Sequence, residues 1–267
     1  RSTAIYLVLA AFLLVTVLVG GKTGAKSILG LILTVAALLT LLIPLLLKGW
    51  PTVLTTFLLC SYVAVVCFVI LGGVNRKILC ACLGTVAGMA LAMLFGLGAQ
   101  ALAHVDGLRI SDVEPLLQLR QSGTPIGLRG LLVAGIIISA LGAVMDVAMS
   151  IASAIAEIHV QNPALSRRAL FRAGMHVGRD MMGTDSNTLI LAFAGGSISM
   201  LVLDYAYNLP YRQIINSNNI GIAIMQGLSG SFGIVLAVPV TVLLAVLLYT
   251  HEPAPASGKP LPELPEN

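Results

Sequence analysis

The sequence predicts an all-α protein, a polytopic transmembrane helical bundle with about seven spans. Hydrophobic residues make up 58% of the 267 residues and charged residues only 10%, whereas soluble domains carry about 25% charged residues. The apolar residues also fall in long runs, and a helix needs ~20 such residues to cross a bilayer. Alternating short segments, which would indicate a membrane β-barrel, do not fill the chain.

We expect one span in each of seven apolar runs: 4–20, 28–47, 53–72, 78–98, 130–155, 183–204 and 221–249. The first run is short, and the fifth and seventh are long enough to tilt or project. Residues 100–128 are predicted as an extracytoplasmic loop. The segment 158–180 is predicted as a cytoplasmic amphipathic helix on the membrane surface, because Pro163 interrupts the chain and Ser166 can cap a helix. The proline-rich tail 251–267 is predicted to be disordered.

Basic residues predict how the chain is oriented, because cytoplasmic loops are enriched in lysine and arginine. Strict alternation places three loops on one side, and these hold Lys22, Lys26, Arg76, Lys77, Arg167, Arg168, Arg172 and Arg179. The other loops hold fewer basic residues or mix them with acidic ones. We therefore expect the N-terminus outside and the C-terminus in the cytoplasm. The net charge of +4 resides in these short loops and does not indicate a nucleic-acid partner.

Asp146 lies inside the fifth predicted span, where a carboxylate costs at least ~2.5 kcal/mol. Ser150, Ser153 and Glu157 follow at i+4, i+7 and i+11, so all four share one helix face. Intramembrane carboxylates usually face a bundle interior or a water path. We predict a buried proton or cation site at Asp146, with a polar route to the cytoplasm past Glu157. The alternatives are a structural Asp146, hydrogen-bonded to another helix, and a Glu157 that is only a solvated helix end.

The sixth predicted span opens with a second group of polar side chains. Their hydroxyl, amide and carboxylate groups can bond to the Asp146 helix or coordinate a cation. The alternative is an ordinary cytoplasmic helix start, with an aspartate as its cap and Arg179 at the headgroups. The group comprises Asp180, Thr184, Asp185, Asn187 and Thr188.

Small residues in two spans predict close helix contacts. They are Gly84 and Gly88 in the fourth span and Gly227, Gly230 and Gly233 in the seventh. Pro239 is expected to kink the seventh span.

The residues do not indicate an enzyme. Gly227-Leu228-Ser229-Gly230 resembles the G-x-S-G of rhomboid proteases, but that chemistry needs a base near the serine. The only later histidine, His251, lies at the far end of the last span. There is no H-E-x-x-H zinc motif, and the four cysteines lack C-x-x-C spacing. We expect no metal and no cofactor.

Several motifs resemble the YibE/F family of bacterial multi-span membrane proteins, and the resemblance covers nearly the whole chain. They are Leu141–Ser150, Glu157-Ile158, Gly178–Thr184, Asn187–Ala192 and Gly230–Thr241. The resemblance implies a multi-pass protein of the bacterial inner membrane, without a well-defined activity. It also implies an earlier anchor helix and an extracytoplasmic domain, which the start at Arg1 suggests were removed. Asp185 departs from the apolar residue expected at its position.

A more distant similarity is to SecDF and the RND transporters. There, a small-x-x-x-Asp helix is followed by a cytoplasmic segment, a helix opening near Asp-x-Asn/Ser-Thr-x-Leu, and a glycine-rich helix. Gly142–Asp146, 158–180, Asp185–Leu189 and 221–249 come in that order. The similarity implies that Asp146 is the protonatable residue, with Asp185 and Thr188 opposite it. Four spans precede the Asp146 helix, so the first half does not align simply.

Together these features predict a proton- or cation-coupled secondary transporter or export component. We expect it to act within the lipid bilayer as a homodimer, or paired with a paralogue. The alternative is a non-transporting membrane scaffold or assembly factor that partners an extracytoplasmic domain.

Overall fold

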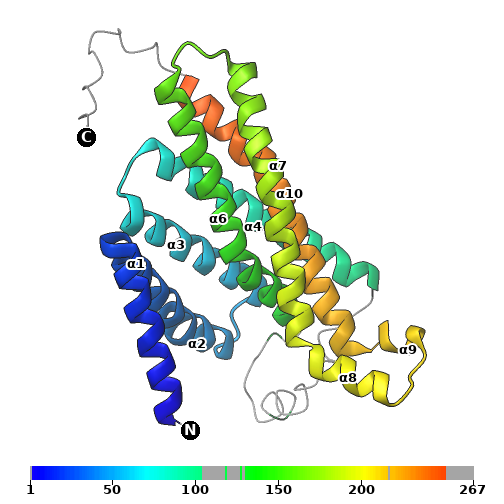
Figure 1. The fold of residues 1–267 in the computed structure, drawn as a ribbon. Coiled ribbons are helices and arrows are strands. Elements are labelled where there is room, and N and C mark those ends of the chain that lie inside the picture. The colour runs from blue at the N-terminus through cyan, green and yellow to red at the C-terminus, as the bar shows by residue number, and fades with distance from the viewer. Residues whose placement is uncertain (1, 104–117, 119–126, 128–129, 216, 251–267) are drawn as a thin grey trace.

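The computed structural model describes residues 2–103, 118, 127, 130–215 and 217–250 (Figure 1). Within these ranges the regular elements are helical. They are α1 (Ser2–Ala37), the π-helical stretch η1 (Leu38–Leu42), α2 (Ile43–Leu47), α3 (Thr52–Gly72), α4 (Arg76–Ala103), α6 (Leu131–Gln161), α7 (Arg167–Gly196), α8 (Ile198–Ala206), α9 (Tyr211–Ile215) and α10 (Asn218–Thr250). Most of the predicted loop 100–128 and the whole tail 251–267 lie outside the described residues.

Five of the described helices are long and apolar enough to cross a membrane, or six if the bent pair α7–α8 counts as one span. We predicted seven. The difference lies in Thr3–Leu47, one continuous run that contains both of the first two predicted spans. This run bends at Gly21, where φ is 53° and ψ is −132°. Such a backbone is open only to glycine.

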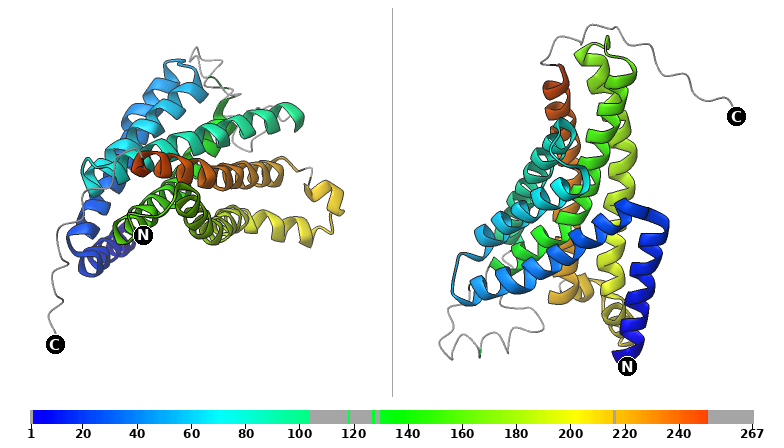
Figure 2. Two further views of the ribbon diagram at one scale, coloured as in Figure 1. Left: turned by 90° about the horizontal axis from the view of Figure 1, so that it is seen from above. Right: turned by 90° about the vertical axis from the view of Figure 1, so that its left-hand side faces the viewer.

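The bend reverses the direction of the chain. Thr16 and Gly24 would lie about 12 Å apart along a straight helix. Instead, the Thr16 carbonyl oxygen lies so close to Gly24 that an added Cβ would clash with it. Figure 2 shows the two halves of α1 meeting in a sharp turn (right view).

Helix α10 forms the centre of the bundle. It packs against α4, α6 and α7, with α4 and α7 on opposite sides of it (Figure 2, left view), and α6 also packs against α4. Its buried residues include Ile234, Ala237 and Val238, which belong to the main hydrophobic core. Because this core is continuous from α3 to α10, the helices that position the polar residues are held by apolar packing.

Basic segments that are far apart in sequence meet at one end of the bundle. Lys26 Nζ donates a hydrogen bond to the Leu71 carbonyl at the end of α3 (3.4 Å). Arg167 Nη2 donates one to the Thr250 carbonyl at the end of α10 (3.3 Å). We call this the basic end.

Residues 158–180 do not form a separate helix on the membrane surface. Helix α6 continues to Gln161, and α7 then runs without a break from Arg167 to Gly196. Ser166 caps α7 as predicted, because its hydroxyl accepts a hydrogen bond from the Ala169 backbone N–H (3.3 Å). The predicted amphipathic helix is therefore the first half of the same helix that contains most of the sixth predicted span.

Glycine explains why this half of α7 packs into the bundle. A Cβ added at Gly174 would lie 2.7 Å from Ile155 of α6 and 3.0 Å from Val242 of α10. One added at Gly178 would clash with Val238 and lie 3.2 Å from Ile151. Two small residues one turn apart thus let three helices approach closely.

Candidate functional site

Asp146 is the central residue of the 31-residue helix α6, so about 22 Å of helix extends to either side of it. Its side chain is exposed, and among the described residues no acidic side chain is buried. The predicted burial of Asp146 is therefore wrong for the single chain. The reason is that α6 buries its apolar face, which includes Val144, Val147 and Ile151. The polar stripe lies on the other face.

The rest of the stripe follows Asp146 toward the basic end. Ser150 and Ser153 are half-buried, and Glu157 is exposed. Glu157 Oε1 accepts a hydrogen bond from Gln161 Nε2 within the same helix (3.1 Å). This local bond fits the helix-end alternative for Glu157.

The contacts of α6 with α7 establish an antiparallel register. Ile155 lies opposite Gly174, and Ile151 opposite Gly178. Asp146 comes five residues before Ile151 in α6, and Gly183 comes five residues after Gly178 in α7. The same register therefore places Asp146 level with Gly183. Thr184 and Asp185 therefore lie at the depth of Asp146.

Asp146 and Asp185 therefore lie at nearly the same depth on two neighbouring antiparallel helices. Asp185 is half-buried, and its Oδ2 atom is buried without a hydrogen-bond partner. The adjacent Ser186 Oγ is likewise buried without one. Leaving a buried polar atom unsatisfied costs about 1–3 kcal/mol.

The predicted hydroxyl bonds from α7 to Asp146 are not formed. Thr188 Oγ1 donates to the Thr184 carbonyl (2.9 Å), and Thr184 Oγ1 donates to the Asp180 carbonyl (3.5 Å). A threonine inside a helix readily satisfies its hydroxyl in this way. Among the described residues, Asp146 has no hydrogen-bond partner.

Asp180 lies away from the Asp146 site. It is exposed, pairs with His176 one turn earlier (3.5 Å), and is not the helix cap, which is Ser166. Asn187 is also exposed and points away from Asp185, because two residues correspond to about 200° of rotation. The residues that the chain itself brings to one depth of the α6–α7 contact are therefore Asp146, Thr184 and Asp185. Thr188 lies one turn of α7 farther on.

The predicted packing glycines lie at helix contacts. A Cβ added at Gly88 would lie 2.6 Å from Val144 and 2.7 Å from Ala237, and one at Gly84 would clash with Thr241. Gly230 meets Leu189 and Gly233 meets Ala92, both at 2.6 Å from the added Cβ. Gly227 has looser contacts with Phe193 and Ile190, and Pro239 lies half-buried within α10.

Sequence analysis missed two features of this bundle. Gly174 and Gly178 form a small-x-x-x-small motif, which predicts close helix packing. It was not interpreted in this way because the segment was predicted to lie on the membrane surface. Thr85 and Thr241 are fully buried in α4 and α10, and neither hydroxyl has a hydrogen-bond partner. Single threonines in apolar runs carry no pattern that would reveal such positions.

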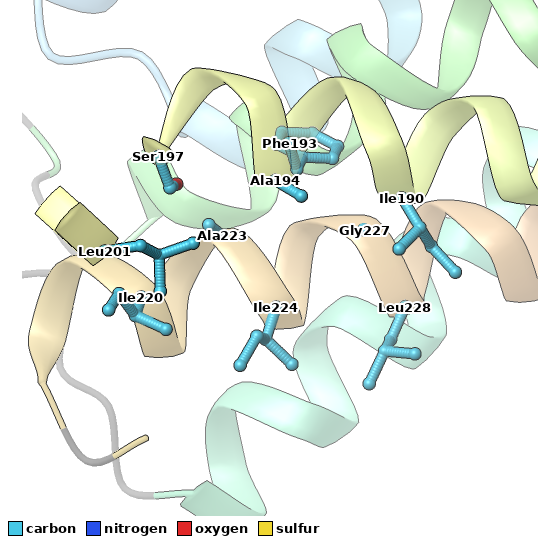
Figure 3. Close-up of a pocket in the computed structure, with 10 residues that line it drawn as sticks. All are labelled: Ile190, Phe193, Ala194, Ser197, Leu201, Ile220, Ala223, Ile224, Gly227 and Leu228. Carbon is cyan, nitrogen blue, oxygen red and sulfur yellow. The ribbon is translucent and has the colours of Figure 1, made fainter. Parts of the chain in front are cut away.

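An apolar pocket lies apart from the carboxylates, between the α7–α8 bend and the start of α10 (Figure 3). It has a volume of about 240 Å³, and Ser197 is the only polar side chain that lines it. Ile190 and Phe193 of α7 lie beside Gly227 of α10. Within the described residues, no three His, Cys, Asp or Glu side chains group as metal ligands would.

The model of the family described as YibE/F-like protein matches residues 8–251. No curated protein and no solved structure matches the chain. The family match carries no evidence for the similarity to SecDF and the RND transporters. It spans the described helices almost completely, including both carboxylates, and the chain therefore belongs to the YibE/F-like family.

Proposed function

We propose that this protein is a proton- or cation-coupled secondary transporter or export component of the bacterial inner membrane. The observation that carries the proposal is the pair Asp146 and Asp185. Two carboxylates lie at the same depth on neighbouring helices, about 22 Å from either end of α6. Intramembrane carboxylates usually mark ion pathways or proton relays.

The chemistry follows from charge repulsion. Two like charges on neighbouring helices repel each other more strongly where the surroundings have a low dielectric constant. One proton or one small cation bound between Asp146 and Asp185 removes that repulsion. Occupancy therefore changes the relative free energy of two α6–α7 arrangements, as ion coupling requires.

We further propose that the basic end is cytoplasmic and that Thr3–Leu47 crosses the membrane twice. As one straight helix its 45 residues would extend about 68 Å, more than twice the ~30 Å hydrocarbon core. Two crossings that meet at Gly21 would give seven spans in all. The N-terminus would then lie outside and the C-terminus inside, in agreement with the positive-inside rule.

The proposal is tested by measuring charge movement in proteoliposomes adsorbed on a solid-supported membrane. Rapid jumps in the concentration of H⁺, Na⁺ or K⁺ report ion binding without a known substrate. We expect a transient current for at least one ion, and at least a tenfold reduction in Asp146→Asn and Asp185→Asn. The matched control is Glu157→Gln, a neutralised carboxylate at the helix end, which should keep most of the current.

The second candidate is a membrane scaffold, and the exposure of Asp146 favours it, because an open polar face suits protein contact. Ion coupling would be rejected if both Asp→Asn variants gave currents as large as those of the wild type. It would also be rejected if the folded wild-type protein gave no current with any ion. Either result would favour the scaffold.

A further inference from the structure

One membrane-depth surface of the protein is polar and uncovered. We call it the outer polar face, formed by Gly142, Asp146 and Ser150 of α6 with Thr184, Asn187 and Thr188 of α7. All but the half-buried Ser150 are exposed. A Cβ added at Gly142 would meet no described atom within 4 Å. The described chain therefore leaves this face open.

The face lies opposite the buried side of α6. That buried side, which includes Val144 and Ile151, packs against α4, α10 and α7. Helix α7 lies on the side of α10 away from α4 (Figure 2, left view). The buried side of α7 faces α6 and α10 through Gly174, Gly178 and Leu189. Thr184, Asn187 and Thr188 lie on other sides of the helix. The face is therefore already accessible, without any movement of the other described helices.

Lipid is a poor cover for this surface. A carboxylate at bilayer depth costs at least ~2.5 kcal/mol on the lenient scale, and exposed amides and hydroxyls add to that. Other exposed surfaces of the bundle are apolar, for example Leu54 and Leu58 on α3 and Leu228 and Val235 on α10. The outer polar face is polar where these lipid-facing surfaces are apolar, and this favours contact with another protein.

We propose that a second copy of this chain covers the outer polar face and completes the site at Asp146. The face is self-complementary, because it presents the Asp146 carboxylate as acceptor and the Asn187 amide as donor. A two-fold axis along the membrane normal keeps depth unchanged, so Asp146 of one copy meets the partner's α7. Asn187 lies only about 6 Å from the level of Asp146.

In this arrangement Asn187 donates a hydrogen bond to Asp146 across the interface, twice per dimer. Gly142 permits the close approach that interhelical hydrogen bonds in membranes need. Asn187 is thus a positioning residue that acts on the partner's carboxylate. The inference shares Asp146 with the proposed function but rests on exposure and complementarity, so its test uses no ion flux.

Contact is measured by photo-crosslinking in native membranes between two co-expressed copies with different tags. The photoreactive residue p-benzoylphenylalanine replaces Asn187 or Gly142, and replaces Leu58 on α3 in the control. We expect an adduct carrying both tags from the first two positions and not from the third. An adduct with another protein or with lipid, or none above the control, would overturn the proposal.

Affinity gives a second measurement, by counting photobleaching steps of labelled protein at increasing dilution in lipid. One interhelical hydrogen bond is worth roughly three- to tenfold in association. Asn187→Leu, which removes two symmetric bonds, should therefore weaken dimerisation by at least about tenfold. Thr40→Leu, an exposed substitution outside the face, should leave it unchanged, and equal dimerisation of the two variants would reject the role of Asn187.

Measuring dimerisation and ion-jump currents on the same protein distinguishes failure of this inference from failure of the proposed function. If the dimer forms and ion-jump currents are absent, the interface stands and ion coupling fails. If currents are present in a protein that stays monomeric at every dilution, ion coupling stands and the inference fails.

Discussion

At the scale of single residues, the pair Asp146 and Asp185 is a local defect in an otherwise apolar packing. Asp185 keeps a buried oxygen without a partner. Asp146, at the same depth on α6, has no hydrogen-bond partner among the described residues. Neither carboxylate forms a described bond that stabilises the fold. Strained or unsatisfied groups that persist in this way commonly serve function at the expense of stability.

This argument predicts that Asp185→Asn stabilises the protein. Raising the pH increases the chance that both carboxylates are charged, so the wild type should lose stability as pH rises, and the variant should lose less. We expect a melting temperature a few degrees above wild type at pH 8 and a smaller difference at pH 5. A thiol-reactive dye can follow unfolding, because all four cysteines are buried and free.

The matched control for this measurement is Ser150→Ala, a polar residue of the same stripe without a charge. Its melting temperature should differ from wild type by the same amount at both pH values. A destabilised Asp185→Asn at pH 8 would show that the carboxylate is part of a stabilising bond.

At the scale of elements, α7 is positioned by two glycines and not by its polar residues. Gly174 and Gly178 set its distance from α6 and α10, and thereby the depth at which Asp185 meets Asp146. Small residues dominate such contacts because lipid gives helices no hydrophobic reason to associate.

We therefore predict that Gly178→Leu destabilises the protein by about 1–3 kcal/mol, the usual cost of overpacking. Val238 and Ile151 occupy the space that the new side chain needs. Gly195→Leu, later in the same helix, meets no described atom within 4 Å and should be tolerated. Thermal unfolding of the two variants in parallel tests this, and equal melting temperatures would contradict the packing role of Gly178.

At the scale of the whole molecule, the bundle divides into a compact core and a loosely attached N-terminal hairpin. Helices α4, α6, α7 and α10 pack against one another, whereas α1 makes its main interhelical contacts with α3. The first half of α1 is exposed along most of its length, with Leu13 and Thr16 half-buried. Within the described chain, this hairpin is therefore attached to the core chiefly through α3.

The hairpin predicts the topology of the chain. In intact cells a membrane-impermeant maleimide should label Thr3→Cys and Lys48→Cys from outside. Lys22→Cys and Asn75→Cys should be labelled only after permeabilisation. Background labelling should be low because the native cysteines are buried. Labelling of Lys22→Cys from outside would mean that Thr3–Leu47 does not cross twice.

Much of the architecture could be predicted from the sequence because apolar length is a one-dimensional property. Twenty apolar residues need a bilayer wherever they pack, so Thr52–Gly72 and Leu131–Gln161 were recognised as spans within a few residues at most boundaries. The Ser166 cap is local chemistry of the same kind. The extent of α7 was not predicted. The polar side of the segment from Arg167 to Asp180 indicates a helix on the membrane surface, whereas its glycines, which pack into the bundle, were not considered.

By itself, the sequence determined the helical membrane class, the family motifs and the polar stripe through Asp146, since all of these are set by residue identity and spacing. Only the tertiary structure decided which way that stripe faces. In a helix that is apolar on most sides, periodicity does not specify which side packs inward, because several faces are equally able to bury. In the folded chain the face of α6 that includes Val144 and Ile151 is buried, and α7 packs against it through Gly174 and Gly178. Asp146 therefore lies on the exposed face.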